Sequence, residues 1–300
     1  MIVISKKVIN RWIQLCYPTI SYGCIRLYQR RCCEYLKVLF WNTHKNVDIN
    51  STICELVEEN NISIVVLAEY TANIDDLLDT LRLQYGLQMR RYYSCCDRIT
   101  IIGEVNDVEV RFDNDHTTIQ IINGKDILCC THLNSKIYSD HEAQRQIMIE
   151  QLMREICAIE KDIDSENTII VGDFNINPYD ASCIDARYFH SIPVYEEAKR
   201  KSRVVAGNEY AMFYNPMWRF LGDRKQPYGT YYHNNSNSIN TYWNLYDQVI
   251  IRPVLRERFV DDSLKIVTET QSKYLLDVNG HPDKAISDHL PIIFEIREEI

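Results

Sequence analysis

From residue 37 onward, short apolar runs alternate with polar turns and with segments that have helical spacing. The runs KVLFWN (37–42) and ISIVVLAEY (62–70) are typical of buried strands. Between them, Ile53, Leu56 and Val57 recur at the spacing of one helix face. The pattern therefore predicts a strand, a helix and a second strand over the first part of this region.

Residues 99–131 are predicted to form an antiparallel meander. Turn residues separate its four apolar runs, which are ITIIGEV (99–105), VEVRF (108–112), TIQIING (118–124) and DILCCTHL (126–133). The pair Asn123-Gly124 is a strong hairpin signal, because a type I′ turn needs positive φ at both central residues. We therefore expect successive runs to pair as neighbouring strands.

A long helix is predicted over residues 139–161. Ser139 and Glu142 form a capping-box pattern at its start. Its apolar residues keep to one face, at Met148, Leu152, Ile156 and Ile159. The strand TIIVGD (168–173) and a shorter helical region follow.

The last third of the chain begins with an irregular, aromatic-rich segment at 203–246. Two strands come after it, YDQVIIRP (246–253) and LPIIFEI (290–296). Mixed strands and helices with a meander favour an α+β fold over a purely parallel, doubly wound sheet. We predict a four-layer αββα sandwich, in which two mixed, mainly antiparallel sheets are flanked by helices.

Charge is distributed unevenly along the chain. The 300 residues carry a formal net charge of −9, with a pI near 5.4, which excludes a protein that coats nucleic acid with a uniformly basic surface. An enzyme that binds a polyanion locally, through metal cations, is compatible with this charge. Residues 1–36 contain six bases and one acid, which leaves a net charge of −14 for the rest of the chain.

Residues 1–36 are therefore set apart as a basic N-terminal extension from a single large domain at 37–300. Apolar residues at helical spacing predict a helix within the extension: Ile9, Trp12, Ile13 and Cys16, before Pro18. This helix could pack on the domain. It could instead lie on an anionic membrane or approach a nucleic-acid backbone.

The cysteine pattern favours a reducing compartment. The chain has eleven cysteines, six of them in three adjacent pairs, and no CxxC motif that would suggest a zinc module. We expect reduced, mostly buried thiols in a cytoplasmic protein. No secretory signal fits the start of the sequence. No apolar run reaches the roughly 20 residues needed to span a bilayer.

Small polar clusters follow directly on several predicted strands. They comprise Asn42, Glu69, His132, Asn134, Asp173, Asn175, Asp247, Asp288 and His289. A lone acid at a strand end is usually a turn former or a helix cap. Strand ends gathered on one edge of a sandwich can instead form one pocket of carboxylates, carboxamides and imidazoles. Oxygen donors of this kind suit Mg²⁺ or Mn²⁺ rather than zinc.

The motifs GDFN (172–175) and SDHLPI (287–292), preceded by Asn42, Glu69 and His132 in that order, resemble the endonuclease/exonuclease/phosphatase superfamily. This is the fold of deoxyribonuclease I, exonuclease III-type repair enzymes, neutral sphingomyelinases and inositol polyphosphate phosphatases. The resemblance implies a metal-dependent phosphodiesterase and makes residues 37–300 its catalytic domain.

The resemblance also implies a metal site for Mg²⁺ or Mn²⁺. Glu69 matches the principal metal carboxylate of the family. Asn42 matches a residue that lies beside this glutamate in the family's site, either as a ligand or as a support for the ligand. Asp288 matches an additional acid on the metal side. The family commonly has glutamine before the metal glutamate, whereas this chain has Ala68, which removes a polar contact but keeps the ligand.

Five residues match catalytic positions. Asp173 matches the residue that orients or deprotonates the attacking water, and Asn175 matches a donor to a phosphate oxygen or to the nucleophile. His289 matches the imidazole that binds the phosphate, and Asp247 the carboxylate that holds this imidazole. His132 matches a second phosphate-binding imidazole.

Three further residues are candidates for substrate binding: Asn134, Thr230 and Arg145. Arg145 also resembles a structural arginine of the family, for which we expect an ion pair. The sequence THLNS (131–135) departs from the Tyr-x-Pro-Asn motif of abasic-site repair enzymes, which disfavours a dedicated abasic endonuclease.

A nuclease acting on DNA or RNA by in-line attack of water is the first hypothesis for function. A phospholipid or inositol-phosphate hydrolase at a membrane surface is the second, and a non-catalytic scaffold is a third; small nucleotides and protein-linked phosphoesters are further possible substrates. The aromatic segment 203–246, with Arg219, Arg224 and Lys225, either packs over the sheet edge or stacks the bases of a single strand.

Overall fold

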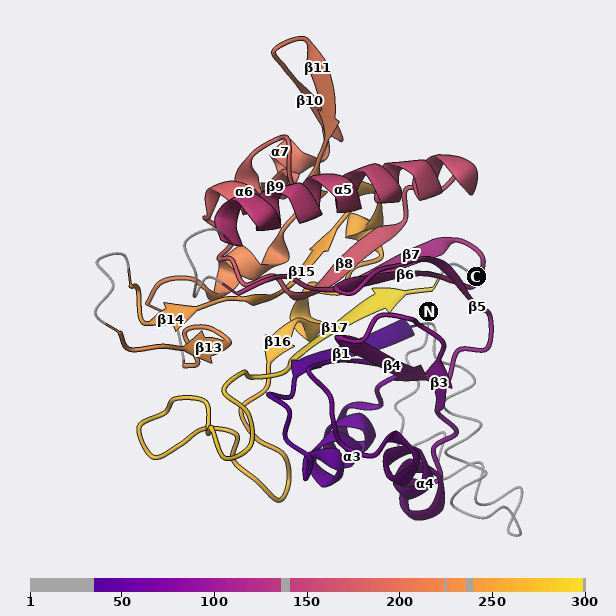
Figure 1. Ribbon diagram of the computed structural model, residues 1–300, viewed down its shortest axis with the longest axis vertical. Helices are drawn as coiled ribbons and strands as arrows, with labels where there is room; N and C mark the ends of the chain where they lie inside the picture. Colours follow the sequence, from indigo (N-terminus) through magenta and orange to yellow (C-terminus); the bar gives the residue numbers. More distant parts are fainter. Residues whose placement is uncertain (1–34, 136–140, 224–225, 236–239, 299–300) are drawn as a thin grey trace, which may run out of the picture.

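Two β-sheets lie face to face with helices on their outer sides (Figure 1). The structure, a computed structural model, describes residues 35–135, 141–223, 226–235 and 240–298. Helices α3 (Asn50–Asn60) and α4 (Ile74–Tyr85) cover one sheet, and α5 (His141–Asp162) covers the other. The predicted α+β fold with two sheets in a layered sandwich is confirmed.

The first sheet has six strands in the order β16-β17-β1-β2-β4-β3. Their bounds are β1 Tyr35–Asn42, β2 Ile64–Ala68, β3 Arg90–Tyr92, β4 Ile99–Gly103, β16 Lys265–Ile266 and β17 Ile292–Arg297. Strands β1 and β2 are parallel, and α3 connects them; all other pairs are antiparallel. Both strands therefore end at the same edge of the sheet.

The second sheet has seven strands in the order β5-β6-β7-β8-β15-β12-β9. Their bounds are β5 Val108–Asp113, β6 Thr117–Ile122, β7 Asp126–His132, β8 Thr168–Asp173, β9 Ser191–Ile192, β12 Phe213–Tyr214 and β15 Asp247–Ile251. The parallel pair β7 and β8, joined through α5, repeats the arrangement of β1 and β2. The antiparallel strand β15 begins where β8 ends.

Alternate residues of the strands fill two different cores. In β1, Leu36, Val38 and Phe40 pack between the sheets, whereas Leu39 and Trp41 pack against α3 and α4. A third cluster fills the space between the second sheet and α5. Burial on both faces explains why the strands read as continuous apolar runs rather than as alternating ones.

An ion pair ties the two sheets together. The Arg258 guanidinium donates to both carboxylate oxygens of Asp126 at 2.7 and 2.6 Å, and both residues are buried. Asp126 begins β7, while the backbone carbonyl of Arg258 accepts from Arg297 at the end of β17. A charged pair with two hydrogen bonds in a buried place fixes the relative position of the sheets.

The structure confirms several local predictions. Asn123 and Gly124 have φ of 52° and 69°, as the predicted type I′ hairpin between β6 and β7 requires. Helix α5 buries Leu152, Ile156 and Ile159 of the predicted face against the second sheet, whereas Met148 is only partly buried and Ile149, which was not predicted, is buried. Ser139 of the predicted capping box lies outside the described residues.

Helix α4 was not predicted. Its signals are an N-cap, a C-cap and an apolar face. The Asn73 side chain accepts from the backbone N–H groups of Asp75 and Asp76, and Gly86 ends the helix with φ of 70°. Leu77 and Leu81 are buried, and Ile74 and Leu78 pack partly buried against the same core, so the sequence contained the spacing of a helix face.

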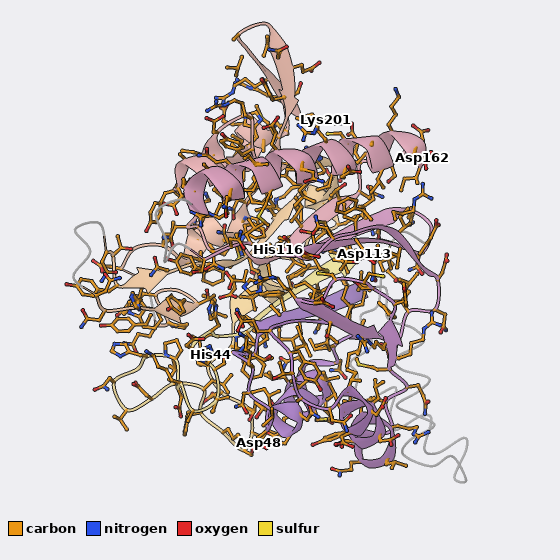
Figure 2. The ribbon with its side chains drawn as sticks, in the orientation of Figure 1. His44, Asp48, Asp113, His116, Asp162 and Lys201 are labelled. Atoms are coloured by element: carbon orange, nitrogen blue, oxygen red, sulfur yellow. The ribbon has the colours of Figure 1, made fainter. Side chains whose placement is uncertain are left out.

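The predicted shorter helical region contains α6 Ala181–Ile184 and α7 Tyr195–Ala198. The predicted irregular region is made of short elements, namely β10 Ser202–Val205, β11 Asn208–Ala211, η1 Pro216–Phe220, β13 Tyr231–Tyr232 and β14 Trp243–Asn244. After β15 come η2 Pro253–Glu257 and η3 Asp261–Ser263. Strands β10 and β11 form a hairpin that projects beyond α5 (Figure 1). Figure 2 labels Asp162 at the end of α5 and Lys201 at the base of this hairpin.

The extension 1–36 lies outside the described residues except for Tyr35 and Leu36, which begin β1. All seven cysteines in the described part of the chain have free thiols. Among the described helices, none is long and apolar enough to cross a membrane.

Candidate active site

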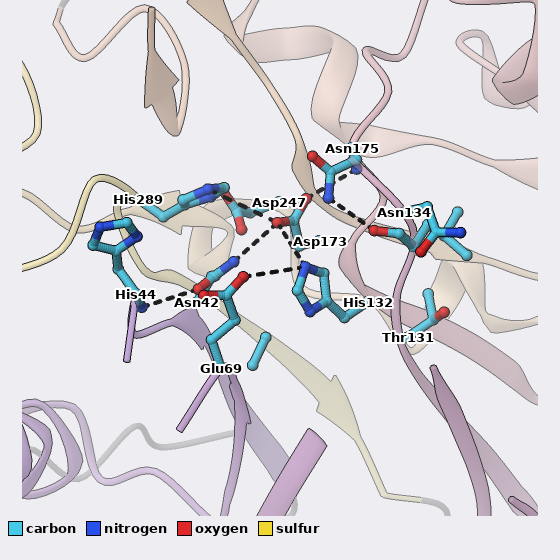
Figure 3. Close-up of polar contacts among 12 residues, drawn as sticks. Asn42, His44, Glu69, Thr131, His132, Asn134, Asp173, Asn175, Asp247 and His289 are labelled. Carbon is cyan, nitrogen blue, oxygen red and sulfur yellow. Dashed lines mark hydrogen bonds and ion pairs between the residues drawn. The ribbon is translucent and has the colours of Figure 1, made fainter. Parts of the chain in front are cut away.

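Strand register brings the polar strand ends together. His132 of β7 pairs with Asp173 of β8, and Asp173 pairs in turn with Asp247 of β15, so these three lie side by side across the second sheet. In the facing sheet, Asn42 ends β1, and Glu69 follows the last residue of β2. Figure 3 shows side chains from both sheets pointing into one site.

The backbone turns sharply at two of these strand ends. Glu69 has φ of 50° and Asn175 has φ of 52°, values that residues other than glycine rarely adopt. Glu69 directly follows β2, and Asn175 comes two residues after the end of β8. Backbone conformations of this kind are held by their surroundings and cluster at functional sites.

Gly172 explains why a glycine precedes Asp173 in the GDFN motif. A Cβ atom at this position would lie 1.9 Å from the carbonyl oxygen of Thr131 on β7. The two strands can therefore pair closely, with His132 beside Asp173, only when residue 172 has no side chain.

Replacing Gly172 with alanine is expected to force β7 away from β8 and to lower the free energy of unfolding by about 1–3 kcal/mol, the usual cost of overpacking. Urea unfolding followed by circular dichroism measures this change as a lower midpoint. A midpoint equal to that of the wild-type protein would show that the sheet can absorb the extra methyl group.

Asp173 is the centre of the site. It is only 1% exposed; its Oδ1 accepts from the Asn175 backbone N–H at 2.9 Å, and its Oδ2 accepts from Asn42 Nδ2 at 3.0 Å. The Nε2 atoms of His132 and His289 lie 3.7 and 3.8 Å from the same Oδ2. The carboxylate is thus fixed by two amides and has an imidazole on either side.

His289 is held as a charged imidazole. Its Nδ1 lies 2.8 Å from Oδ2 of the fully buried Asp247. Burial disfavours the charged form, but the carboxylates of Asp247 and Asp173 outweigh it and raise the pKa of His289 to about 10. Its backbone carbonyl accepts from the Trp41 indole N–H at 2.9 Å, so the position of the residue is fixed as well.

His132 has the opposite charge state. Burial lowers the pKa of its imidazole, despite the carboxylates of Asp173 and Glu69 nearby, so this ring is neutral at pH 7. Its Nε2 lies 3.7 Å from Glu69 Oε1 and 3.7 Å from Asp173 Oδ2. The site therefore has one cationic and one neutral imidazole, on opposite sides of Asp173.

The oxygen atoms of Glu69, Asn42 and Asp288 are of the type that a hard divalent cation prefers. The Glu69 side chain is 25% exposed and is the most accessible of the central carboxylates. Asn42 Oδ1 accepts from the His44 backbone N–H at 3.0 Å and keeps a second lone pair. Asp288 Oδ1 is buried and accepts no hydrogen bond of good geometry, although His44 Nδ1 lies 3.1 Å and His289 Nε2 4.0 Å from it. A cation would satisfy that oxygen.

A second group of possible metal ligands includes Asp173. Ligand atoms of Asp173, Asp247 and His289 lie within 4.8 Å of one another. Asp247 Oδ2 also lies 2.8 Å from His289 Nδ1, so these three residues form a hydrogen-bonded arrangement of charged groups as well.

The structure places two of the proposed substrate-binding residues in supporting positions. Thr230 is fully buried, and its Oγ1 accepts from the Asp247 backbone N–H at 3.2 Å, beneath the His289 pair. Arg145 is 1% exposed; it donates to the backbone carbonyl of Asn134 at 2.9 Å and pairs with Glu142. Both therefore hold site segments in place, and Arg145 has the ion pair that its structural role implies.

Asn175 lies next to Asp173, and Asn134 lies on the side of His132 away from His289 (Figure 3). The Asn175 side chain donates to the Leu133 backbone carbonyl at 2.9 Å, and the Asn134 amide contacts Met148 Sδ at 3.6 Å. Asn175 is thereby bound to the segment after β7, next to Asp173. The Asn134 side chain turns toward α5 rather than toward Asp173.

Three residues of the site were missed from the sequence. His44 lies beside Asp288; Ser287 donates to the Asn42 carbonyl at 2.7 Å and accepts from the His289 N–H; and the Tyr231 ring lies 4.7 Å from the His289 ring. Ser287 begins the motif SDHLPI, and Tyr231 directly follows the candidate residue Thr230, so the sequence around both predicted positions contained this signal.

Comparison with solved structures gives matches over nearly the whole chain. The 3′-5′ exonuclease NExo from Neisseria meningitidis has a TM-score of 0.53 and 14% identity, covering 87% of this chain and 99% of its own. The NExo 3′ phosphatase from Neisseria, bound to product DNA hairpin, has a TM-score of 0.51 and 14% identity, with the same coverages. An AP endonuclease from Archaeoglobus fulgidus has a TM-score of 0.50 and 14% identity, covering 86% and 98%.

No protein-family model and no curated protein matches the sequence. The structural matches nevertheless cover 86–87% of the chain. They show that the chain has a deoxyribonuclease I-like fold, which is the fold that the resemblance in GDFN and SDHLPI implies.

Proposed function

We propose that the protein is a divalent-metal-dependent phosphodiesterase that hydrolyses nucleic acid. The observation that supports this most strongly is the arrangement around Asp173. A buried carboxylate, fixed by Asn42 and by the backbone of Asn175, stands between the cationic His289 and the accessible Glu69. This arrangement offers separate places for a water molecule, a phosphate and a cation.

Each residue has a defined part in the proposed reaction. Asp173 holds the attacking water by one carboxylate oxygen and takes its proton. The protonated His289 donates from Nε2 to a phosphate oxygen and stabilises the charge that develops there, while Asp247 keeps its ring fixed and charged. Mg²⁺ or Mn²⁺ held by Glu69, with Asn42 and Asp288, would supply Lewis-acid stabilisation of the phosphate.

The names of the matched structures favour a nucleic acid as the substrate. They are an exonuclease, an AP endonuclease and a phosphatase bound to product DNA. A membrane-surface hydrolase would depend on residues 1–36, which lie outside the described residues, and the matches lend it no support. The free cysteines of the described part support the proposed cytoplasmic location.

The test is a cleavage assay with the full chain on single-stranded DNA, duplex DNA, RNA and phospholipid vesicles. We expect cleavage of nucleic acid with Mg²⁺ or Mn²⁺, loss of cleavage after chelation, and recovery when Mg²⁺ is restored. Glu69→Gln should need a higher Mg²⁺ concentration. Asp76→Asn, which neutralises an exposed acid on α4, should not. Release of a lipid headgroup while all nucleic acids stay intact would disprove the proposal.

A further inference from the structure

A cavity of about 340 Å³ opens beside the active site. Asp288, the neighbour of His289, lines one end of it, and Tyr232 and His281 line another part. The volume lies within the usual range for small-ligand pockets. A larger depression of about 520 Å³ lies on the loop Tyr274–Gly280 and contains none of the site residues, so the smaller cavity is the one connected with the chemistry.

The aromatic wall of this cavity joins two segments that are distant in sequence. The rings of Tyr232, on β13, and His281, on the loop before β17, stack with centroids 3.6 Å apart and planes at 9°. Trp243 of β14 lies 5.4 and 6.0 Å from the rings of Tyr232 and Tyr228. These half-buried or exposed rings therefore form a continuous series. Because successive residues of a strand point to opposite faces, the series lies on the opposite side of β13 from Tyr231.

Of the basic residues in the aromatic segment, Arg219 is described, and it does not line the cavity. Arg219 donates to the backbone and side-chain oxygens of Asp261 at 2.7 and 2.6 Å, away from the aromatic wall. Arg224 and Lys225 lie outside the described residues. The hypothesis that an arginine assists base stacking therefore does not apply to Arg219. The aromatic rings are the feature of this region that can bind a base.

The charge of the lining distinguishes between a phosphate and a base. Asp277, Asp283 and Asp288 line the cavity against one cation, Lys284. Asp277 is fixed, because its Oδ1 accepts the backbone N–H groups of Asn279 and His281 at 2.8 and 3.0 Å. Such a lining repels a phosphate group, whereas it suits a flat, uncharged ring with N–H donors on its edge.

We propose that this cavity binds the unpaired nucleoside next to the phosphate at His289, so that the substrate is held as a single strand or a frayed end. The inference rests on the proposed function and specifies the substrate class for the same site. The flanking base lies against Tyr232 and His281, and its N–H edge faces the aspartates. A base that is paired within a duplex cannot enter, because both its face and its edge are already occupied.

Equilibrium binding tests the cavity without requiring turnover. The full chain is titrated, in EDTA, into a fluorescein-labelled five-nucleotide DNA strand, and anisotropy gives the Kd. Tyr232→Ala and His281→Ala are expected to raise the Kd by roughly 5- to 150-fold, the equivalent of one lost stacking contact. Tyr274→Ala, an exposed ring outside the cavity, is expected to leave the Kd unchanged. A blunt-ended hairpin, whose stem contains the same five nucleotides and is long enough to stay paired, should bind more weakly than the single strand.

Tyr232→Phe separates stacking from folding, because it keeps the ring and should bind as the wild-type protein does. Wild-type affinity in both alanine variants, or equal affinity for hairpin and single strand, would overturn the proposal. A protein that binds through the cavity but cleaves no substrate with Mg²⁺ would contradict the proposed function and leave the cavity supported. Cleavage with unaltered binding in the alanine variants would contradict the cavity alone.

Discussion

Replacing Asp173 with asparagine is expected to reduce turnover of nucleic acid by roughly 10²–10⁴-fold, the range for a lost general acid–base group. Asparagine has the same shape, and its carbonyl oxygen can still accept one of the two amide hydrogen bonds that hold Asp173. It cannot take a proton from water, and it removes a negative charge 3.8 Å from His289 Nε2.

Turnover is measured as kcat with saturating Mg²⁺, and thermal unfolding is followed in parallel. The expected result is a large fall in kcat with a melting temperature close to that of the wild-type protein. Asp76→Asn serves as the matched control, since it makes the same change at an exposed position on α4. If Asp173→Asn kept kcat within tenfold of the wild-type value, Asp173 could not be the residue that activates the water.

The convergence of the site was predictable because it follows from strand ends. Asn42, Glu69, His132 and Asp173 each stand where an apolar run stops, and parallel strands β1–β2 and β7–β8 place such ends at common edges. Gly172 was visible in the motif, but the reason why a glycine is needed at this position was not. The close approach of Thr131 is a property of the pairing between two strands, which no single segment specifies.

The surroundings of the site were less predictable, since they depend on burial and on loops. Thr230 has the sequence context of a residue that contacts substrate, yet it is fully buried beneath Asp247. The stack of Tyr232 on His281 joins residues 49 positions apart through segments without helical or strand periodicity. Contacts of this kind are selected by tertiary packing, and a local pattern contains no signal for them.

Replacing Asp247 with asparagine is expected to change the pH at which the enzyme works. In the wild-type protein the carboxylates of Asp247 and Asp173 overcome the effect of burial and raise the pKa of His289 to about 10. The imidazole is therefore protonated below that pH, and activity that depends on it should persist until the pH approaches 10. Without the negative charge of Asp247 at 2.8 Å from Nδ1, burial becomes the larger effect and lowers the pKa of His289.

In Asp247→Asn the alkaline limb of the pH–rate profile should therefore move down by several pH units. At pH 8 the variant should be slower by roughly 10²–10³-fold, as for a lost electrostatic donor, and it should recover part of its rate at pH 6. The profile of kcat against pH, together with the NMR titration of the imidazole nitrogens, measures both effects. Asp76→Asn should keep the limb near pH 10. An unmoved limb in Asp247→Asn would mean that another group sets the charge on His289.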